Sequence, residues 1–177
     1  MYISYEISNS KLSIILLLLS AFIGGSICIL LPAAAKVLFG VNEIITTLLF
    51  NYIIIGFTVY LVNGPWKDPN SAATYVGKEV YLPTIFGRLS YGFIICILCT
   101  AGVYYLKEKS VFGYELRISG GSALTAIYAG INAKQKAFIA MLIGGGLAGL
   151  AGGVELLSQT HRVSTGLSQG FGYTAII

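Results

Sequence analysis

The amino-acid sequence predicts an all-α, polytopic membrane protein with about four transmembrane helices and a short helix in one connecting loop. The first observation is composition: 56% of the 177 residues are hydrophobic, only 10% are charged, and the mean hydropathy is +0.82. A soluble domain carries about 25% charged residues. The second observation is that the apolar residues gather in runs of nearly the roughly 20 residues that cross a bilayer as a helix. Intrinsic disorder is excluded, because it requires low hydrophobicity and high charge.

The four expected spans are residues 13–31, 43–62, 89–106 and 137–157. They are expected to be helices because in lipid every backbone amide and carbonyl has to find a partner within its own segment. The first span is expected to end at Pro32, and it is longer than the hydrophobic region of about 7–15 residues in a signal peptide. Residues 1–177 are therefore treated as a single transmembrane domain.

The distribution of Lys and Arg predicts the orientation. The loop at 107–136 is the most basic, and together with Lys36 it places six of the 11 Lys and Arg residues on one side and five on the other. The positive-inside rule then puts loop 107–136 in the cytoplasm. The formal net charge of +4 is too small to indicate a nucleic-acid partner, and it suits loops that face anionic membrane lipid.

Within this loop, residues 122–130 predict a short helix. Ser122 is a good N-cap, and Gly130 can end the helix in a left-handed conformation. Gly120 and Gly121 are expected to let the chain turn before it, and Asn132 is expected to cap the next helix. Ala126 lies on a side of small residues that would allow close approach of a partner. The pattern suits either an element that couples the chain to a cytoplasmic protein or an ordinary helix on the membrane surface.

The fourth span contains Gly145, Gly149 and Gly153 at a spacing of four residues. Such rows of small residues let helices pack backbone to backbone in lipid, so they predict a tight bundle or an oligomer interface.

Three polar residues are candidates for a translocation path. Glu155 lies at the end of the fourth span, where an acidic group faces either a charge partner or a polar cavity. His161 and Arg162 follow it, and Arg162 could pair with Glu155 if the helix continued. Asn51, in the second span, is a candidate for the path or for a hydrogen bond to a neighbouring helix.

The enzyme motifs in the sequence lack the context that catalysis needs. Gly166-Leu167-Ser168-Gln169-Gly170 matches the nucleophile motif of hydrolases, but the single histidine precedes it in the chain. No phosphate-binding loop of the form GxxxxGK[ST] occurs, so any ATP use has to come from a partner. Cys96 and Cys99 lie in an apolar run and are interpreted as small packing residues. We expect no catalytic residue, no metal site and no cofactor.

Several segments occur together in an order that carries a family resemblance. They are residues 40–47 (GVNEIITT) with Asn51 and Tyr52, residues 63–65 (NGP) with 67–69 (KDP), residues 112–117 (FGYELR) leading to 128–132 (YAGIN), residues 146–152 (GLAGLAG) with Glu155, and residues 170–176 (GFGYTAI). The combination resembles the permease subunits of bacterial ATP-binding cassette (ABC) importers, in the superfamily for branched-chain amino acids, ribose and nucleosides. The simple sugar and nucleoside permeases are the most similar group.

The resemblance implies a function and a set of partners. The chain would be a permease subunit in the bacterial inner membrane that imports nucleosides or simple sugars. Its partners would be a second permease subunit, an ABC ATPase and an extracytoplasmic substrate-binding protein, with membrane lipid around it. The segment around 115–131 would contact the ATPase through Glu115, Arg117, Ser122, Ala126, Gly130 and Ile131. Members of this family are longer, so the chain is expected to be part of a larger bundle. The alternative is a truncated, non-transporting membrane scaffold or remnant subunit.

Overall fold

The computed structural model describes residues 10–64, 74–75, 84–86, 89–160 and 162–163, and the structural statements below concern these residues. Its helices are α2 (Ser10–Phe39), α3 (Glu43–Asn63), α4 (Gly92–Glu108), α5 (Val111–Gly121), α6 (Ala123–Tyr128) and α7 (Ala133–Glu155), followed by the π-helix η1 (Leu156–Thr160). Two short antiparallel pairs join β1 (Thr74–Tyr75) to β4 (Arg162–Val163) and β2 (Thr84–Phe86) to β3 (Leu89–Ser90).

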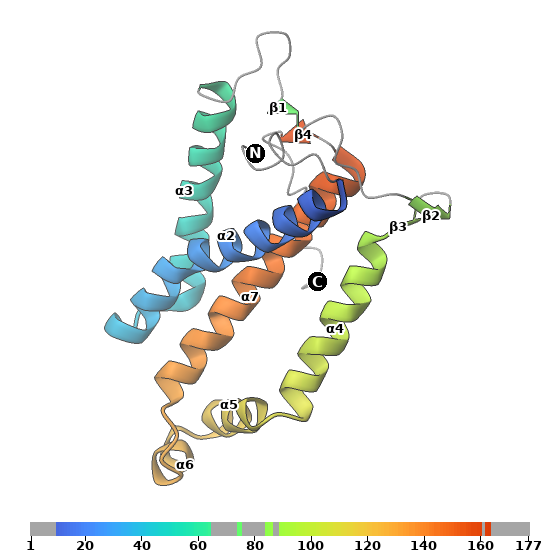
Figure 1. Ribbon diagram of the computed structural model, residues 1–177. Helices are drawn as coiled ribbons and strands as arrows, with labels where there is room; N and C mark the ends of the chain where they lie inside the picture. The colour runs from blue at the N-terminus through green and yellow to red at the C-terminus, as the bar shows by residue number, and fades with distance from the viewer. Residues whose placement is uncertain (1–9, 65–73, 76–83, 87–88, 161, 164–177) are drawn as a thin grey trace.

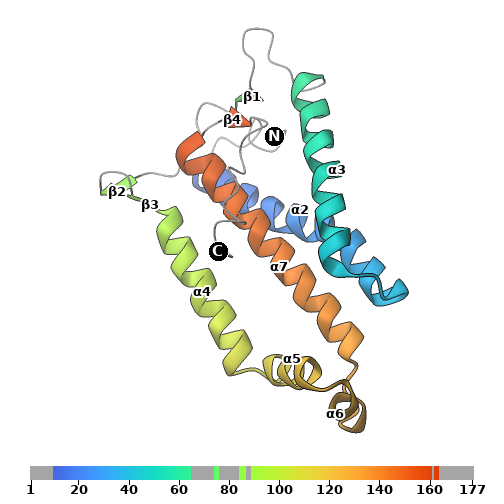
Figure 2. The same cartoon turned by 180° about the vertical axis from the view of Figure 1, so that it is seen from behind.

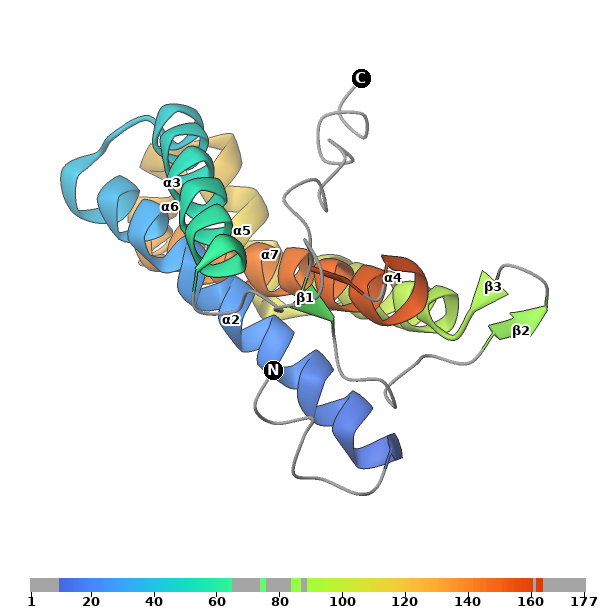
Figure 3. The same cartoon turned by 90° about the horizontal axis from the view of Figure 1, so that it is seen from above.

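The fold is built around the crossing of α2 and α7, which make the most extensive contact between any two elements (Figure 1). The helix α3 lies on one side of this pair and α4 on the other, and the view from behind shows the same order (Figure 2). Seen from above, α2 runs obliquely across α7 rather than parallel to it (Figure 3). The short helices α5 and α6 lie together at one end, and the described strands lie at the opposite end.

The all-α membrane fold predicted from composition is confirmed. Three segments are long and apolar enough to cross a membrane: Ser13–Phe39, Glu43–Asn63 and Ala133–Ser158. The helix α4 covers most of the expected third span with 17 residues, at the lower limit of the roughly 17–25 residues that cross a bilayer. Most large apolar side chains of these helices are exposed, as expected where lipid or further helices cover them.

The expectation that the first helix ends at Pro32 is wrong. The helix α2 continues through Pro32 to Phe39, and the proline side chain is fully buried. Proline removes only one backbone donor, and neighbouring helices in a membrane bundle compensate for the loss. The first helix is therefore longer than the predicted span at both ends.

The expected turn at Gly120 and Gly121 is also wrong. Both glycines form the last residues of α5, a helix that the sequence analysis did not predict within the loop 107–136. Its start was visible in the sequence, because Ser110 is an N-cap residue and its side chain accepts a hydrogen bond from the backbone N–H of Gly113. The chain turns instead at Ser122, which has an extended backbone.

Candidate functional site

One face of α7 forms a close backbone contact with α2, and the predicted glycine row lies in it. A Cβ atom placed on Gly149 would meet the carbonyl oxygen of Ala21 and would lie 2.9 Å from the Cα of Gly25. On Gly145 it would lie 2.9 Å from the carbonyl oxygen of Gly25, and on Gly153 2.9 Å from the Cβ of Ala21. All three glycines are therefore needed for the observed distance between the helices, and the contact lies within one chain.

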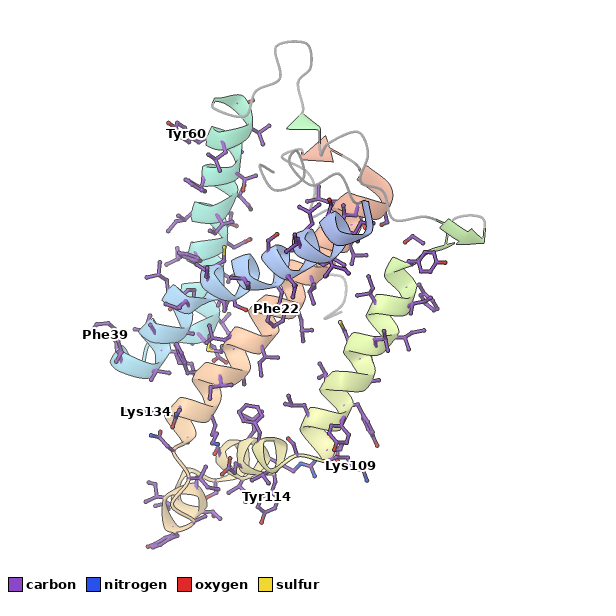
Figure 4. All side chains as sticks on the ribbon, viewed as in Figure 1. Phe22, Phe39, Tyr60, Lys109, Tyr114 and Lys134 are labelled. Atoms are coloured by element: carbon purple, nitrogen blue, oxygen red, sulfur yellow. The ribbon has the colours of Figure 1, made fainter. Side chains whose placement is uncertain are left out.

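Side chains reinforce the same contact. The ring of Phe22 covers Gly146, which is buried, and Figure 4 shows Phe22 on α2 where it crosses α7. The hydroxyl of Ser26 donates a hydrogen bond of 3.1 Å to the carbonyl oxygen of Leu142. A backbone contact supported by a hydrogen bond between helices is a stable arrangement in lipid.

The opposite side of α7 borders a cavity of about 580 Å³ that separates it from α4. The lining is mostly apolar, with Thr100, Tyr104 and Glu155 as polar groups. Where α4 begins, the two helices touch, because a Cβ on Gly92 would collide with the side chain of Val154. The lining residues are Gly92, Ile95, Cys96, Cys99, Thr100, Val103 and Tyr104 of α4, and Leu147, Leu150, Ala151, Val154 and Glu155 of α7.

Two of the candidate path residues, Glu155 and Asn51, are not brought together. Glu155 is half-buried in the wall of the α4–α7 cavity, whereas Asn51 is exposed on α3, which contributes no residue to that wall. His161 lies outside the described residues, as does the motif around Ser168. The helical continuation expected to join Glu155 to Arg162 is absent, since η1 follows α7 and Arg162 pairs with Tyr75 in a strand.

The helix α5 is joined firmly to the end of α4. Gly113 is buried, and a Cβ there would meet the carbonyl oxygens of Leu106 and Lys107. The Ser110 hydroxyl donates to the carbonyl oxygen of Leu106, and Arg117 forms an ion pair of 2.7 Å with Glu108. The direction of α5 relative to α4 is thus determined by backbone contacts as well as by side chains.

A second set of contacts joins α5 to the beginning of α7. Glu115 forms an ion pair of 2.5 Å with Lys136, and each side chain is 24% exposed. The Lys136 amine also lies 5.6 Å from the centre of the Phe112 ring, a distance at which the ring attracts a cation. Glu115 and Arg117, expected to face a partner, therefore both form ion pairs within this chain.

The helix α6 has the caps that the sequence predicts. The Ser122 side chain accepts a hydrogen bond from the N–H of Thr125, and Gly130 has a φ of +70°, in the left-handed region. The Asn132 side chain accepts from the N–H of Gln135 and so begins α7. The N–H of Ile131 donates to the carbonyl oxygen of Ala126.

One alanine of α6 packs against the chain itself. Ala126 is fully buried, although the sequence analysis expected it to face a partner. The exposed side carries Leu124, Ile127 and Tyr128, with exposed fractions of 68%, 71% and 89%. Helical spacing and the buried Ala126 together would have identified this apolar face, but the sequence alone did not show which side of the short helix packs inward.

Charged residues gather at the end of the molecule that contains α6. Within residues 107–136 there are five Lys or Arg residues and two Glu residues, and Figure 4 shows Lys109 and Lys134 near the ends of α4 and α7. Lys36 lies at the same end, because it lines a cavity with Leu116 and Lys134. The helix α6 lies at this end of the molecule, next to α5 and the beginning of α7 (Figures 1 and 2). The apolar face of α6 therefore lies at the end of the molecule where these charged residues gather.

Comparison with known proteins gives the family. Residues 1–177 match the family described as the branched-chain amino acid transport system permease component. The chain belongs to this family. No solved structure matches it.

Individual members of the permease family with curated names are similar along most of this chain. The guanosine ABC transporter permease protein NupP of Bacillus subtilis is 29% identical over 91% of the chain and 49% of its own length. A glucose ABC transporter permease protein of Haloferax volcanii is 27% identical over 91% of the chain and 46% of its length. The nucleoside ABC transporter permease protein NupB of Lactococcus lactis is 26% identical over 90% and 48%. The chain thus spans about half the length of these relatives.

Proposed function

We propose that this chain is the membrane-embedded part of an ABC importer that moves nucleosides or simple sugars across the inner membrane of a bacterial cell. The proposal is supported by the permease family and by relatives named for guanosine, nucleoside and glucose transport. In this function the chain works with a second permease subunit and an extracytoplasmic substrate-binding protein. ATP hydrolysis takes place in a separate subunit.

The observation that carries the proposal is the exposed apolar face of α6. Leu124, Ile127 and Tyr128 point away from the chain at the end where Lys and Arg residues gather. We propose that this end lies outside the hydrocarbon region, where lipid tails do not cover apolar side chains and a protein partner buries them. Clusters of this kind, with an aromatic residue among aliphatic ones, act as binding hot spots. We assign this face to the ATPase.

The α4–α7 cavity is the proposed place of the translocation path. It runs along two helices that cross or nearly cross the membrane, and it contains Glu155, Thr100 and Tyr104 in an otherwise apolar wall. An aromatic ring with a few hydrogen-bonding groups suits a nucleoside base or a sugar ring. We propose that Asn51 and His161 contribute polar groups to the translocation path in the assembled complex.

Uptake into proteoliposomes tests the function. The permease subunits, the companion ATPase and the substrate-binding protein are reconstituted, and entry of labelled guanosine, uridine and glucose is measured with and without ATP. We expect ATP-dependent entry of at least one nucleoside or sugar. The double variant I127A/Y128A should lower the affinity for the ATPase by about 30-fold or more, because the loss of a single hot-spot residue costs about 2 kcal/mol or more. The matched control is Y60A, which removes an exposed tyrosine at the other end of the molecule.

The same assay separates the alternative of a non-transporting scaffold. A complex that assembles with the ATPase but moves none of the three solutes would support the scaffold and reject the importer. Equal ATPase binding by I127A/Y128A and wild type would reject α6 as the docking element, even if uptake were observed.

A further inference from the structure

The helix α4 is held to α7 in two places, at opposite ends of the cavity between them. At one end the helices touch directly, with Gly92 against Val154. At the other end they are joined through α5, which lies between the last turn of α4 and the first turn of α7 (Figure 2). Between these ends the cavity of about 580 Å³ separates the helices. The separation of α4 and α7 at the α5 end therefore depends on how α5 is attached.

The two attachments of α5 differ in kind. Its joint with α4 relies on the buried Gly113 packed against two backbone carbonyls, a contact that no side-chain movement can release, and on the hydrogen bonds of the Ser110 hydroxyl. Its attachment to α7 relies on Lys136, which pairs with Glu115 and lies over the ring of Phe112. A side-chain contact can break while both helices stay folded. Thus α4 and α5 form one unit, and the Lys136 contacts hold the α5 end of this unit to α7.

In the chain, α6 lies between α5 and α7, the two helices that the Glu115–Lys136 ion pair joins. It directly follows α5, its Ala126 is buried against the chain, and the Ala126 carbonyl accepts from Ile131 immediately before α7 begins. A partner that moves α6 consequently changes the position of Glu115 relative to Lys136. The pair is only 24% exposed on each side, so it is less screened by water than a surface pair, and separating it has a measurable cost.

We propose that Glu115 and Lys136 are positioning residues for transport: their ion pair sets the separation of α4 and α7 at the α5 end, and with it the width of the α4–α7 cavity, and movement of α6 by the ATPase makes or breaks the pair. This inference rests on the proposed importer function. Glu115 acts on the path through α5 and contacts neither substrate nor nucleotide. The Arg117–Glu108 pair joins α4 to α5 inside one unit, so it provides a matched ion pair that should not respond to α6.

The chain's own cysteines allow the opening of the cavity to be measured without knowledge of the substrate. Cys96 and Cys99 line the cavity, and Cys28 lies on α2. A thiol reacts with a maleimide as the thiolate, so labelling requires water at the sulfur. In inside-out membrane vesicles that contain the full complex with the C28A chain, a membrane-impermeant maleimide reports water entry into the cavity.

We expect ATP to change the labelling rate of Cys96 and Cys99 by about fivefold or more, the lower end of the usual coupling between two sites. In E115Q and in K136Q this ratio should fall to nearly one, and the charge swap E115K/K136E should restore it. R117Q should keep the response of the C28A chain. An undiminished ATP response in E115Q and K136Q would overturn the proposal, and so would a swapped chain that is present in normal amount and fails to respond.

If the charge-swapped chain inserts poorly into the membrane, a comparison of the double variant E115Q/K136Q with the two single variants tests the ion pair. When two residues act through one contact, E115Q/K136Q loses no more of the ATP response than either single variant, whereas independent roles give additive losses. Additive losses would overturn the ion pair as the element that positions α4 against α7. Failure of the importer function itself is distinguishable, because then the C28A chain either binds no ATPase or moves none of the labelled solutes in the proteoliposome assay. An ATPase that co-purifies, together with an ATP response that E115Q leaves intact, rejects the ion-pair proposal alone.

Discussion

The two faces of α7 differ sharply in how they meet their neighbours. Toward α2, Gly145 and Gly149 bring two backbones into contact, and a hydrogen bond joins Ser26 to α7. Toward α4, the same helix borders a cavity and touches its neighbour at one end. Backbone contact through glycine cannot be loosened without losing most of its packing. We infer that α2 and α7 form the fixed part of the chain and that α4, with α5, forms the part that moves.

The largest expected effect comes from a large side chain on the fixed face. Gly149→Leu has no room beside Ala21 and Gly25, so we expect a loss of about 1–3 kcal/mol or more in stability. Thermal unfolding of the detergent-solubilised chain measures it. Gly144→Leu is the matched control, because Gly144 is exposed on the same helix and nothing lies within 4 Å of an added Cβ. Equal melting temperatures for the two variants would contradict the fixed interface.

A large side chain on the cavity face should act on transport instead. Ala151 is an exposed residue of α7 in the cavity wall, and Ala151→Phe fills space that is empty in this structure. We expect stability to change by no more than about 0.5 kcal/mol, as for a substitution that displaces no packed group. Uptake in proteoliposomes should fall roughly tenfold, which corresponds to about 1.4 kcal/mol in the barrier. Normal uptake by this variant would exclude the cavity as the path.

The smallest expected effect concerns the start of α6. Ser122→Ala removes the side-chain oxygen that accepts from Thr125, which costs about 1 kcal/mol of local helix stability. Amide hydrogen exchange in residues 123–128 should become faster, with ATPase binding reduced less than in I127A/Y128A. Ser119→Ala is the control, since the Ser119 hydroxyl only donates to the Glu115 carbonyl within α5. Exchange that is unchanged in Ser122→Ala would mean that contacts with α5 alone maintain α6.

Part of this organisation was predictable from the sequence because the deciding signals are local. The caps at Ser122 and Asn132, the left-handed Gly130 and the apolar lengths of the spans depend on neighbouring residues only. The continuation of α2 past Pro32 was not predictable, because it depends on packing around a buried proline. The burial of Ala126 and the ion pair between Glu115 and Lys136 depend on where α5 lies, and α5 was not predicted from the sequence.

The most direct test of the account is site-specific photo-crosslinking of the assembled complex. A photoreactive phenylalanine analogue is introduced in place of Tyr128, which is 89% exposed on α6, or of Tyr60, which is 66% exposed at the other end of the molecule. The account predicts a covalent adduct with the ATPase from position 128 and none from position 60. An adduct from position 60, or a complex that contains the ATPase and gives no adduct from position 128, would contradict it.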